Sequence, residues 1–280
     1  MSRPSRGRTA IRAATDETGP GTVAAVLAST FPHVFVSDAG ANNLNAAAAS
    51  LSPTSRFSFR HAPAEAADTW LPPSTVDFAS IGMAFHYMDA DAALRSVAKT
   101  LKPGGTLAAV TYGFRLLFPG RPRAQQLWYD VVSAETTRLI REGKVFPAAV
   151  KGAARAMTGL DFVPVPGELY RAVRRVYINI TPEEERPFCF LEPDGDVWKP
   201  ATSAVAGGEE KDYVEDAGWG RQADGTWLRG FLASSQLGFD ERTWDTQGWK
   251  ELEEIVAAGP EGKVEIRWPV AVLLASRRAD

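Results

Sequence analysis

The sequence contains few of the residues that build disulfides and metal centres. Its 280 residues include one cysteine, Cys189, and three histidines, His33, His61 and His86, which show no spacing typical of metal ligands. A single cysteine excludes a disulfide within the chain and fits a reducing compartment, so we expect a cytoplasmic protein. The histidine pattern argues against a zinc site, and we expect no metal.

Long apolar runs and an excess of charge are missing as well. No stretch approaches the ~18 apolar residues that a membrane span needs, and the net charge at pH 7 is −3. Nothing electrostatic therefore indicates a nucleic-acid partner. We expect the partner to be a small-molecule substrate, with neither nucleic acid nor membrane involved, and the sequence leaves the oligomeric state open.

Short apolar strands alternate with helices in the first part of the chain. Such alternation predicts βαβ units with right-handed crossovers. The expected fold class is therefore α/β, a Rossmann-like, mostly parallel sheet with helices on both faces. The expected strands are His33–Asp38, Phe57–Arg60, Val76–Ile81 and Thr106–Val110, and the helices between them include Asn42–Leu51 and Asp91–Leu101.

This rhythm stops after about residue 120. We expect a helix over Gln125–Ile140, followed by an aromatic-rich, irregular segment over residues 146–230 that forms a lid. A helix over Trp249–Val256 and one long strand over Val264–Ala275 follow. The expected division is a flexible leader over residues 1–12, a cofactor-binding core over 13–120, a lid or substrate insertion over 121–235, and a C-terminal helix and strand over 236–280.

Two features of the core are suited to ligand binding. Gly19-Pro20-Gly21 opens a helix, where glycines allow close backbone approach and the helix N-terminus favours negative charge. Asp38 ends the next strand, where a carboxylate can accept hydrogen bonds from two ribose hydroxyls. Each also has an ordinary structural interpretation, as a plain turn and as a helix N-cap or turn former.

The order of short motifs adds a family resemblance. G-P-G-T at residues 19–22, A-P-A-E at 62–65, A-F-H-Y-M-D at 84–89 and L-K-P-G-G-T-L at 101–107 resemble the class I S-adenosylmethionine-dependent methyltransferases, in particular the group related to trans-aconitate methyltransferase. That resemblance implies S-adenosylmethionine as cofactor and S-adenosylhomocysteine as product. The implied cofactor residues are Gly19 and Gly21 for the methionine part, Asp38 for the ribose, Ala64 and Glu65 for the adenine, and Gly82 and Met83 beside the sulfonium.

The start of the chain departs from the pattern of that family. Its first strand usually leads into D-x-G-x-G-x-G, whereas A-A-T-D-E-T-G-P-G at residues 13–21 has two glycines and poor strand character. The N-terminal helix that normally covers the cofactor is also missing. We expect that the chain is either shortened relative to its relatives or has lost part of its cofactor pocket.

An enzyme promotes methyl transfer mainly by aligning and desolvating the reactants. A hydroxyl or carbon acceptor also needs a general base, and His86 is the candidate because an imidazole titrates near neutrality. The alternative is that His86 is a structural residue at a strand-to-helix junction. Candidates for the substrate pocket are Tyr112, Arg115, Trp219 and Trp227, the arginine for an anionic group and the aromatic rings for an apolar one.

A set of six aromatic residues between positions 198 and 249 has two interpretations. They either line a pocket for an apolar molecule or fill the core between the insertion and the sheet. The leading hypothesis is a methyltransferase for a small, apolar or carboxylate-bearing metabolite. The alternatives are a cyclase or isomerase that has lost methyl transfer and a non-catalytic binding subunit, because the fold alone does not decide between them. The six residues of this aromatic set are Trp198, Tyr213, Trp219, Trp227, Trp244 and Trp249.

Overall fold

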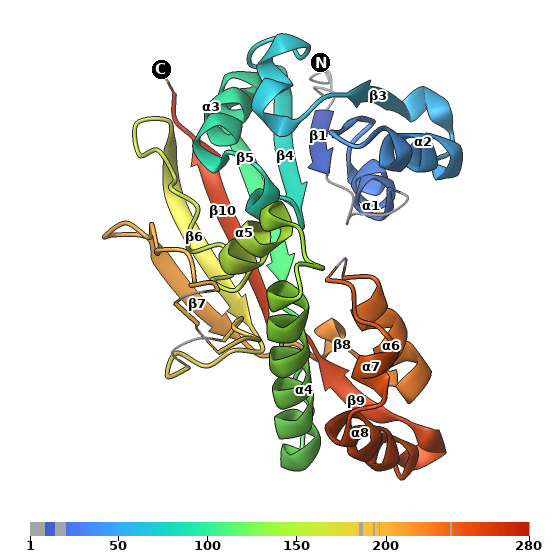
Figure 1. Ribbon diagram of the computed structural model, residues 1–280. Coiled ribbons are helices and arrows are strands. Elements are labelled where there is room, and N and C mark those ends of the chain that lie inside the picture. The colour runs from blue at the N-terminus through green and yellow to red at the C-terminus, as the bar shows by residue number, and fades with distance from the viewer. Residues whose placement is uncertain are drawn as a thin grey trace.

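An eight-stranded sheet organises the chain in the computed structural model (Figure 1). The structure describes residues 9–14, 21–184, 187–192, 194–195, 197–235 and 237–279. The strand order is β3-β2-β1-β4-β5-β10-β6-β7, and β10 is antiparallel to both of its neighbours. This arrangement confirms the expected α/β fold with a mostly parallel sheet.

The first half of the sheet follows the expected alternation. Its parallel strands are β1 (Thr9–Ala14), β2 (His33–Asp38), β3 (Phe57–His61), β4 (Val76–Gly82) and β5 (Leu101–Tyr112). The connecting helices are α1 (Thr22–Thr30), α2 (Ala41–Ser50) and α3 (Ala90–Thr100), with short 3₁₀ turns η2 (Ala64–Thr69) and η3 (Phe85–Tyr87). The four strands expected from the sequence are all present.

Helix α3 shows how local sequence sets these elements. Asp89 caps its N-terminus by accepting a hydrogen bond from the backbone N–H of Ala92 at 3.0 Å. Leu94 and Val97 are fully buried on the face that packs against the sheet. Because these two apolar residues are three positions apart, their side chains lie on one face of the helix. The helix that connects β4 to β5 therefore has an apolar face that is buried.

The leader expected over residues 1–12 is wrong for its last part. Residues 9–12 belong to β1, which pairs with β2 on one side and β4 on the other, with Ala14 opposite both Asp38 and Gly82. The six residues T-A-I-R-A-A carry little strand propensity, but a central strand gains backbone hydrogen bonds from two neighbours. Residues 1–8 and Gly19 lie outside the described residues.

The expected irregular lid also contributes to the sheet. Helices α4 (Pro122–Arg141) and α5 (Pro147–Ala156) are followed by β6 (Tyr170–Ile178) and β7 (Glu210–Val214), which extend the sheet beyond β10. The sequence hides β6 because its apolar pattern is interrupted by Arg174 and Arg175. Arg175 is nevertheless buried, since Glu209 lies beside it in an ion pair.

The expected C-terminal strand is two strands. β9 (Val264–Arg267) pairs with β8 (Gly220–Ala223) in a small separate sheet, while β10 (Val270–Arg277) joins the main sheet. The break falls at Trp268-Pro269, because proline cannot donate a ladder hydrogen bond. The expected helix is present as α8 (Gln247–Ala257), preceded by α6 (Gly225–Ala233) and α7 (Glu241–Trp244).

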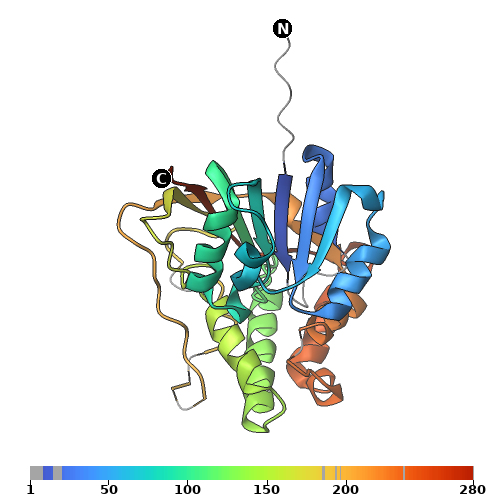
Figure 2. The ribbon, with the colours of Figure 1, turned by 90° about the horizontal axis from the view of Figure 1, so that it is seen from above.

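Two larger cores result from this arrangement. One lies between the sheet and α3, and the second joins α4 to the C-terminal helices around the fully buried Trp128 and Trp249. Figures 1 and 2 show α4 and these helices extending beyond the carboxyl ends of β4 and β5. This second group of elements therefore stands over the edge where ligands bind in parallel α/β sheets.

Candidate functional site

The register of the sheet brings the predicted cofactor residues to one edge. Asp38 ends β2 and Gly82 ends β4, and both lie opposite Ala14 of the intervening β1. Adjacent strands lie about 4.8 Å apart, so Asp38 and Gly82 are roughly 10 Å from each other across this edge. The carboxyl ends of the three strands thus lie side by side at one edge of the sheet.

Gly21 stands where the backbone enters α1 on this edge. Its φ of 91° lies in the left-handed region, and an added Cβ would lie 3.0 Å from the side chain of Leu51. Both conditions require glycine here. The helix N-terminus that it opens leaves backbone N–H groups without partners inside the helix, which suits an anionic group.

Asp38 is almost completely buried although it is a carboxylate. It is 3% exposed, and its Oδ1 accepts a hydrogen bond from the backbone N–H of Gly40 at 2.7 Å. This bond fixes the carboxylate at the strand end, as an acceptor directed to a ligand requires.

One carboxylate oxygen of Glu65 is buried without a hydrogen-bond partner among the described residues. This oxygen is Oε2, whereas Oε1 accepts the backbone N–H of Asp89 at 2.9 Å. A buried carboxylate oxygen without a donor is costly, so a ligand donor such as an amino group on a purine ring would satisfy it. The neighbouring Ala64 instead packs into the core at 1% exposure. The residues at this edge therefore fit an adenosine-containing cofactor.

Met83 follows Gly82 in a strained conformation. Its φ is 49°, which is rare outside glycine, and its backbone N–H donates to the carbonyl of Val110 at 2.8 Å. Its Sδ lies 3.2 Å from the backbone nitrogen of Tyr112. Strain of this kind is concentrated at ligand sites, and here it turns the chain sharply away from the end of β4.

A small, mostly apolar cavity adjoins Met83 on the side away from β1. Its volume is about 30 Å³, which is room for about one water molecule. It is lined by the expected residues Met83, His86 and Tyr112, together with Tyr87, Gly113, Phe114, Ala149, Ala153, Ala156, Phe188, Phe190, Ser235 and Leu237. The lining of the cavity therefore comes from the end of the core sheet, from α5 and from two later loops.

His86 is the buried titratable group of this cavity. It is 6% exposed, belongs to η3, and its ring centroid lies 4.1 Å from that of Tyr87. Helix α5 covers η3 closely, since a Cβ on Gly152 would lie 2.8 Å from the Tyr87 ring. The structure thus places the proposed base beside the strand end and under the lid.

Three of the expected pocket residues lie elsewhere. Arg115 lines a different, polar cavity and pairs with Glu184 at 3.1 Å, so it is not at the cavity beside Met83. Trp219 and Trp227 are also absent from the described lining of that cavity. Trp227 stacks on Phe231 at 5.2 Å, and Phe231 in turn contacts the cavity residue Phe114, so two rings stand between Trp227 and the cavity.

Sequence reasoning missed the side of the cavity that the insertion builds. α5 supplies three alanines, and the loops supply Phe188, Phe190, Ser235 and Leu237. The row of small residues in P-A-A-V-K-G-A-A-R-A is a signal for a closely packed helix, but it does not indicate what the helix packs against.

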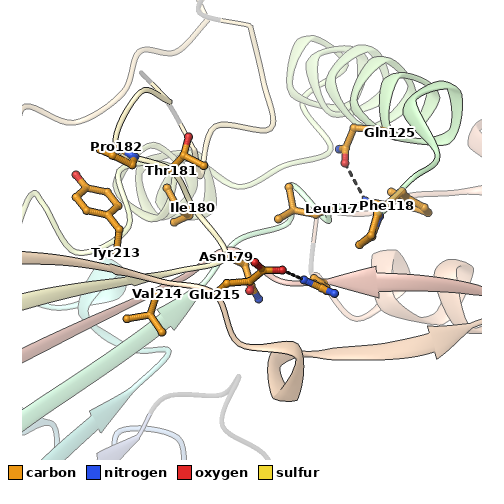
Figure 3. Close-up of a pocket in the computed structure, with 12 residues that line it drawn as sticks. Leu117, Phe118, Gln125, Asn179, Ile180, Thr181, Pro182, Tyr213, Val214 and Glu215 are labelled. Carbon is orange, nitrogen blue, oxygen red and sulfur yellow. Dashed lines mark hydrogen bonds and ion pairs between the residues drawn. The ribbon is translucent and has the colours of Figure 1, made fainter.

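A larger groove lies further along the same edge, at the carboxyl ends of β6 and β7. Its volume is about 460 Å³, and Figure 3 shows Tyr213 on one wall facing Leu117 and Phe118 on the other. On its floor Arg267 donates to Glu215 at 2.5 Å. Among the residues described, none of those expected to bind the cofactor or to act in catalysis lines this groove.

Comparison with known proteins adds independent findings. A family model described as a methyltransferase domain matches residues 18–109. The methyltransferase cfoB of Aspergillus candidus is 30% identical over 278 residues, covering 93% of this chain and 82% of the relative. The methyltransferase AacuQ of Aspergillus aculeatus is 26% identical, covering 93% and 81%. The subgroup related to trans-aconitate methyltransferase stays a prediction.

The fold is similar to that of a solved structure as well. A protein assigned to the type II methyltransferases, from Anaeromyxobacter dehalogenans, aligns with a TM-score of 0.56 at 20% identity and covers 94% of this chain and 88% of its own. Within the described ranges, no helix is both long and apolar enough to cross a membrane. The same ranges contain no group of three or more histidine, cysteine or acidic residues placed to hold a metal ion.

Proposed function

The chain belongs to the methyltransferases of the class I fold, and from this premise we propose that it uses S-adenosylmethionine to methylate a small, largely apolar metabolite. The observation that carries the proposal is the position of Met83. It stands between the row of strand ends that holds Asp38 and Gly82 and the apolar cavity that holds His86. A group bound on one side of Met83 would face a group bound on the other.

The cofactor roles follow from the chemistry of the edge. The buried carboxylate of Asp38 is suited to accept the ribose hydroxyls, and the unpartnered Oε2 of Glu65 is suited to accept the adenine amino group. The α1 N-terminus at Gly21 is suited to the carboxylate of the methionine part. When bound, S-adenosylmethionine would supply a sulfonium methyl carbon, to which a nucleophilic atom of the acceptor bonds as the carbon–sulfur bond breaks, so that S-adenosylhomocysteine is the leaving group.

The residues of the cavity would act on the acceptor. Phe114, Phe188 and Phe190 exclude water and favour an apolar or aromatic molecule. His86 would accept the proton of an acceptor hydroxyl, with its imidazole held under α5. A carboxylate acceptor would need no base, so dependence on His86 distinguishes the two acceptor types.

The cyclase or isomerase and the binding subunit are not favoured. The relatives named above carry the name methyltransferase, and their likeness extends over 93% of the chain, including the insertion that closes the cavity. An unpartnered Glu65 oxygen also supports a retained cofactor site over an abandoned one.

The proposal is tested by titration calorimetry with S-adenosylmethionine and S-adenosylhomocysteine. We expect Asp38→Asn to weaken both affinities roughly 10- to 100-fold, because a hydrogen bond to a charged group contributes about 1.5–3 kcal/mol. Asp212→Asn, on the exposed edge strand β7, is the matched control and should bind like the wild type. No heat of binding at millimolar ligand, with correctly folded protein, would refute the cofactor assignment.

An acceptor screen with methyl-labelled cofactor then tests the substrate class. Phenols, apolar alcohols and aromatic carboxylic acids are compared in the same assay. Transfer to the hydroxyl compounds that disappears in His86→Asn supports the assignment of His86 as base. Transfer that goes to carboxylic acids and is unaffected by His86→Asn would contradict that assignment.

A further inference from the structure

Arg155, near the end of α5, connects the lid to the segment that carries His86. Its Nη1 donates to the carbonyl of Met88 at 2.9 Å and to that of His86 at 3.5 Å. Its guanidinium also lies 5.6 Å from the centre of the Phe162 ring, which holds the side chain in place. A hydrogen bond from a charged donor is stronger than one from a neutral donor, so this contact sets where the two carbonyls lie.

The segment around His86 depends on such outside contacts. It is a single turn of 3₁₀ helix, whose internal hydrogen bonds use earlier carbonyls and leave those of His86 and Met88 for other donors. On the cofactor side, Glu65 accepts the backbone N–H of Asp89 at 2.9 Å. Arg155 provides the corresponding contact on the lid side. The segment is thus held between the cofactor edge and α5.

The contact of α5 with Tyr87 and His86 at Gly152 is one of close packing. Gly152 and the neighbouring alanines allow close approach but offer no polar group. Two glycines with left-handed φ, Gly143 at 70° and Gly159 at 63°, flank the helix. The covered cavity holds about 30 Å³, so binding of an acceptor requires its lining elements, α5 among them, to move apart, and a directional contact favours return to the closed arrangement.

We propose that Arg155 is a positioning residue for methyl transfer. By holding the His86 and Met88 carbonyls when α5 is closed, it sets the His86 imidazole against the acceptor. This inference rests on the proposed function, in which His86 accepts the acceptor proton. Misplacement of a reacting group by about 1 Å costs about 100-fold in rate, so loss of the contact should appear in kcat.

The test compares Arg155→Gln with Lys151→Gln and Arg155→Lys in the full chain. Lys151 is an exposed residue one turn earlier on α5, so its substitution removes the same charge from the same helix. We measure kcat and KM for a hydroxyl acceptor, the cofactor affinity, and hydrogen–deuterium exchange over residues 84–92. We expect R155Q to lower kcat about tenfold or more, to leave cofactor affinity unchanged, and to raise exchange in that segment. K151Q should match the wild type, and R155K should recover part of kcat because a lysine can still donate.

Each other outcome overturns the inference in a recognisable way. Faster exchange in R155Q with an unchanged kcat would mean that the contact is structural and does not position His86. Unchanged exchange and kcat would mean that the contact does not hold the segment. A lower Tm without a change in kcat would contradict the inference equally. If the wild-type chain binds no cofactor and transfers no methyl group, the proposed function fails, and that failure is visible before any variant is compared.

Discussion

Arg175 of β6 offers a sharp test of how the second half of the sheet is held together. Its side chain is 2% exposed, and its Nε lies 2.5 Å from a carboxylate oxygen of Glu209, which is 5% exposed. Its terminal nitrogens donate to the carbonyls of Leu160 and Val163 at 2.6 and 3.0 Å. Those carbonyls belong to the turn that follows α5, so Arg175 anchors the base of the lid to the sheet.

Replacing Arg175 by methionine preserves most of the side-chain volume but removes these hydrogen bonds. Glu209 then stays buried without its cation, and removal of one partner from a buried pair costs about 3–5 kcal/mol. The carbonyls of two further residues also lose their hydrogen-bond donor. We therefore expect the unfolding free energy to fall by an amount near the upper end of that range. The matched control is Arg174→Met on the same strand. Arg174 pairs with Asp212 at the surface and is 48% exposed, so its loss should be below about 1 kcal/mol.

Urea unfolding at pH 7, followed by circular dichroism and tryptophan fluorescence, measures both variants. The double variant R175M/E209Q adds a direct check, because a neutral side chain at position 209 removes the stranded charge and should recover part of the stability. Equal losses for R175M and R174M would refute the assignment of Arg175 as a buried anchor. A double variant no more stable than R175M would show that the stranded charge is not the cause.

Three further predictions concern catalysis, acid stability and a tight turn. His86→Asn should lower kcat for a hydroxyl acceptor about 100-fold or more and leave cofactor affinity unchanged, as initial rates and calorimetry would show; an unaltered kcat excludes the role. The hydrogen bond from Lys144 lowers the pKa of Asp240 from 3.8 to about 2. Its ionised form therefore stabilises the fold above about pH 4, and this contribution is lost as the pH falls toward 2. Asp240→Asn keeps a good N-cap on α7. In this variant the unfolding free energy should decrease less steeply than in the wild type as the pH is lowered, and an equally steep decrease would contradict the prediction. Gly259→Ala puts a methyl group 2.0 Å from a backbone carbonyl oxygen and should cost about 1–3 kcal/mol in calorimetric melts, unlike Gly167→Ala, whose added group meets no atom within 4 Å.

Periodicity was enough to predict the core of the fold but not its start. β2 to β5 are apolar or alternating strands bounded by turn residues, and α3 carries a regular apolar stripe, so local pattern and tertiary role agree. β1 is different, because residues 9–14 gain their place from two neighbouring strands. The poor strand character of residues 13–21 therefore gave no sign of β1, which ends at Ala14.

The second half of the sheet was hidden by charge and by a proline. Arg175 interrupts the apolar pattern of β6, and its partner Glu209 lies 34 residues away in the chain. No periodicity pairs two such distant residues. In the C-terminal segment, Pro269 follows Trp268 between an alternating stretch and an apolar one, and the chain changes sheet at that point. A proline within a strand pattern was the available signal for this break.

The candidate site also has a part that the sequence predicts and a part that it does not. The residues proposed for the cofactor lie at the carboxyl ends of neighbouring parallel strands, which the alternation of strands and helices brings to one edge of the sheet. The cavity proposed for the acceptor is lined largely by α5 and two loops, and composition alone does not reveal which aromatic ring faces it. Trp227 illustrates the difficulty, since Phe231 and Phe114 stand between it and the space that it was expected to line. The number of side-chain layers between a residue and a cavity is set by tertiary packing, so the shape of this cavity depends on positions such as Gly152 and Phe188 that local sequence does not single out.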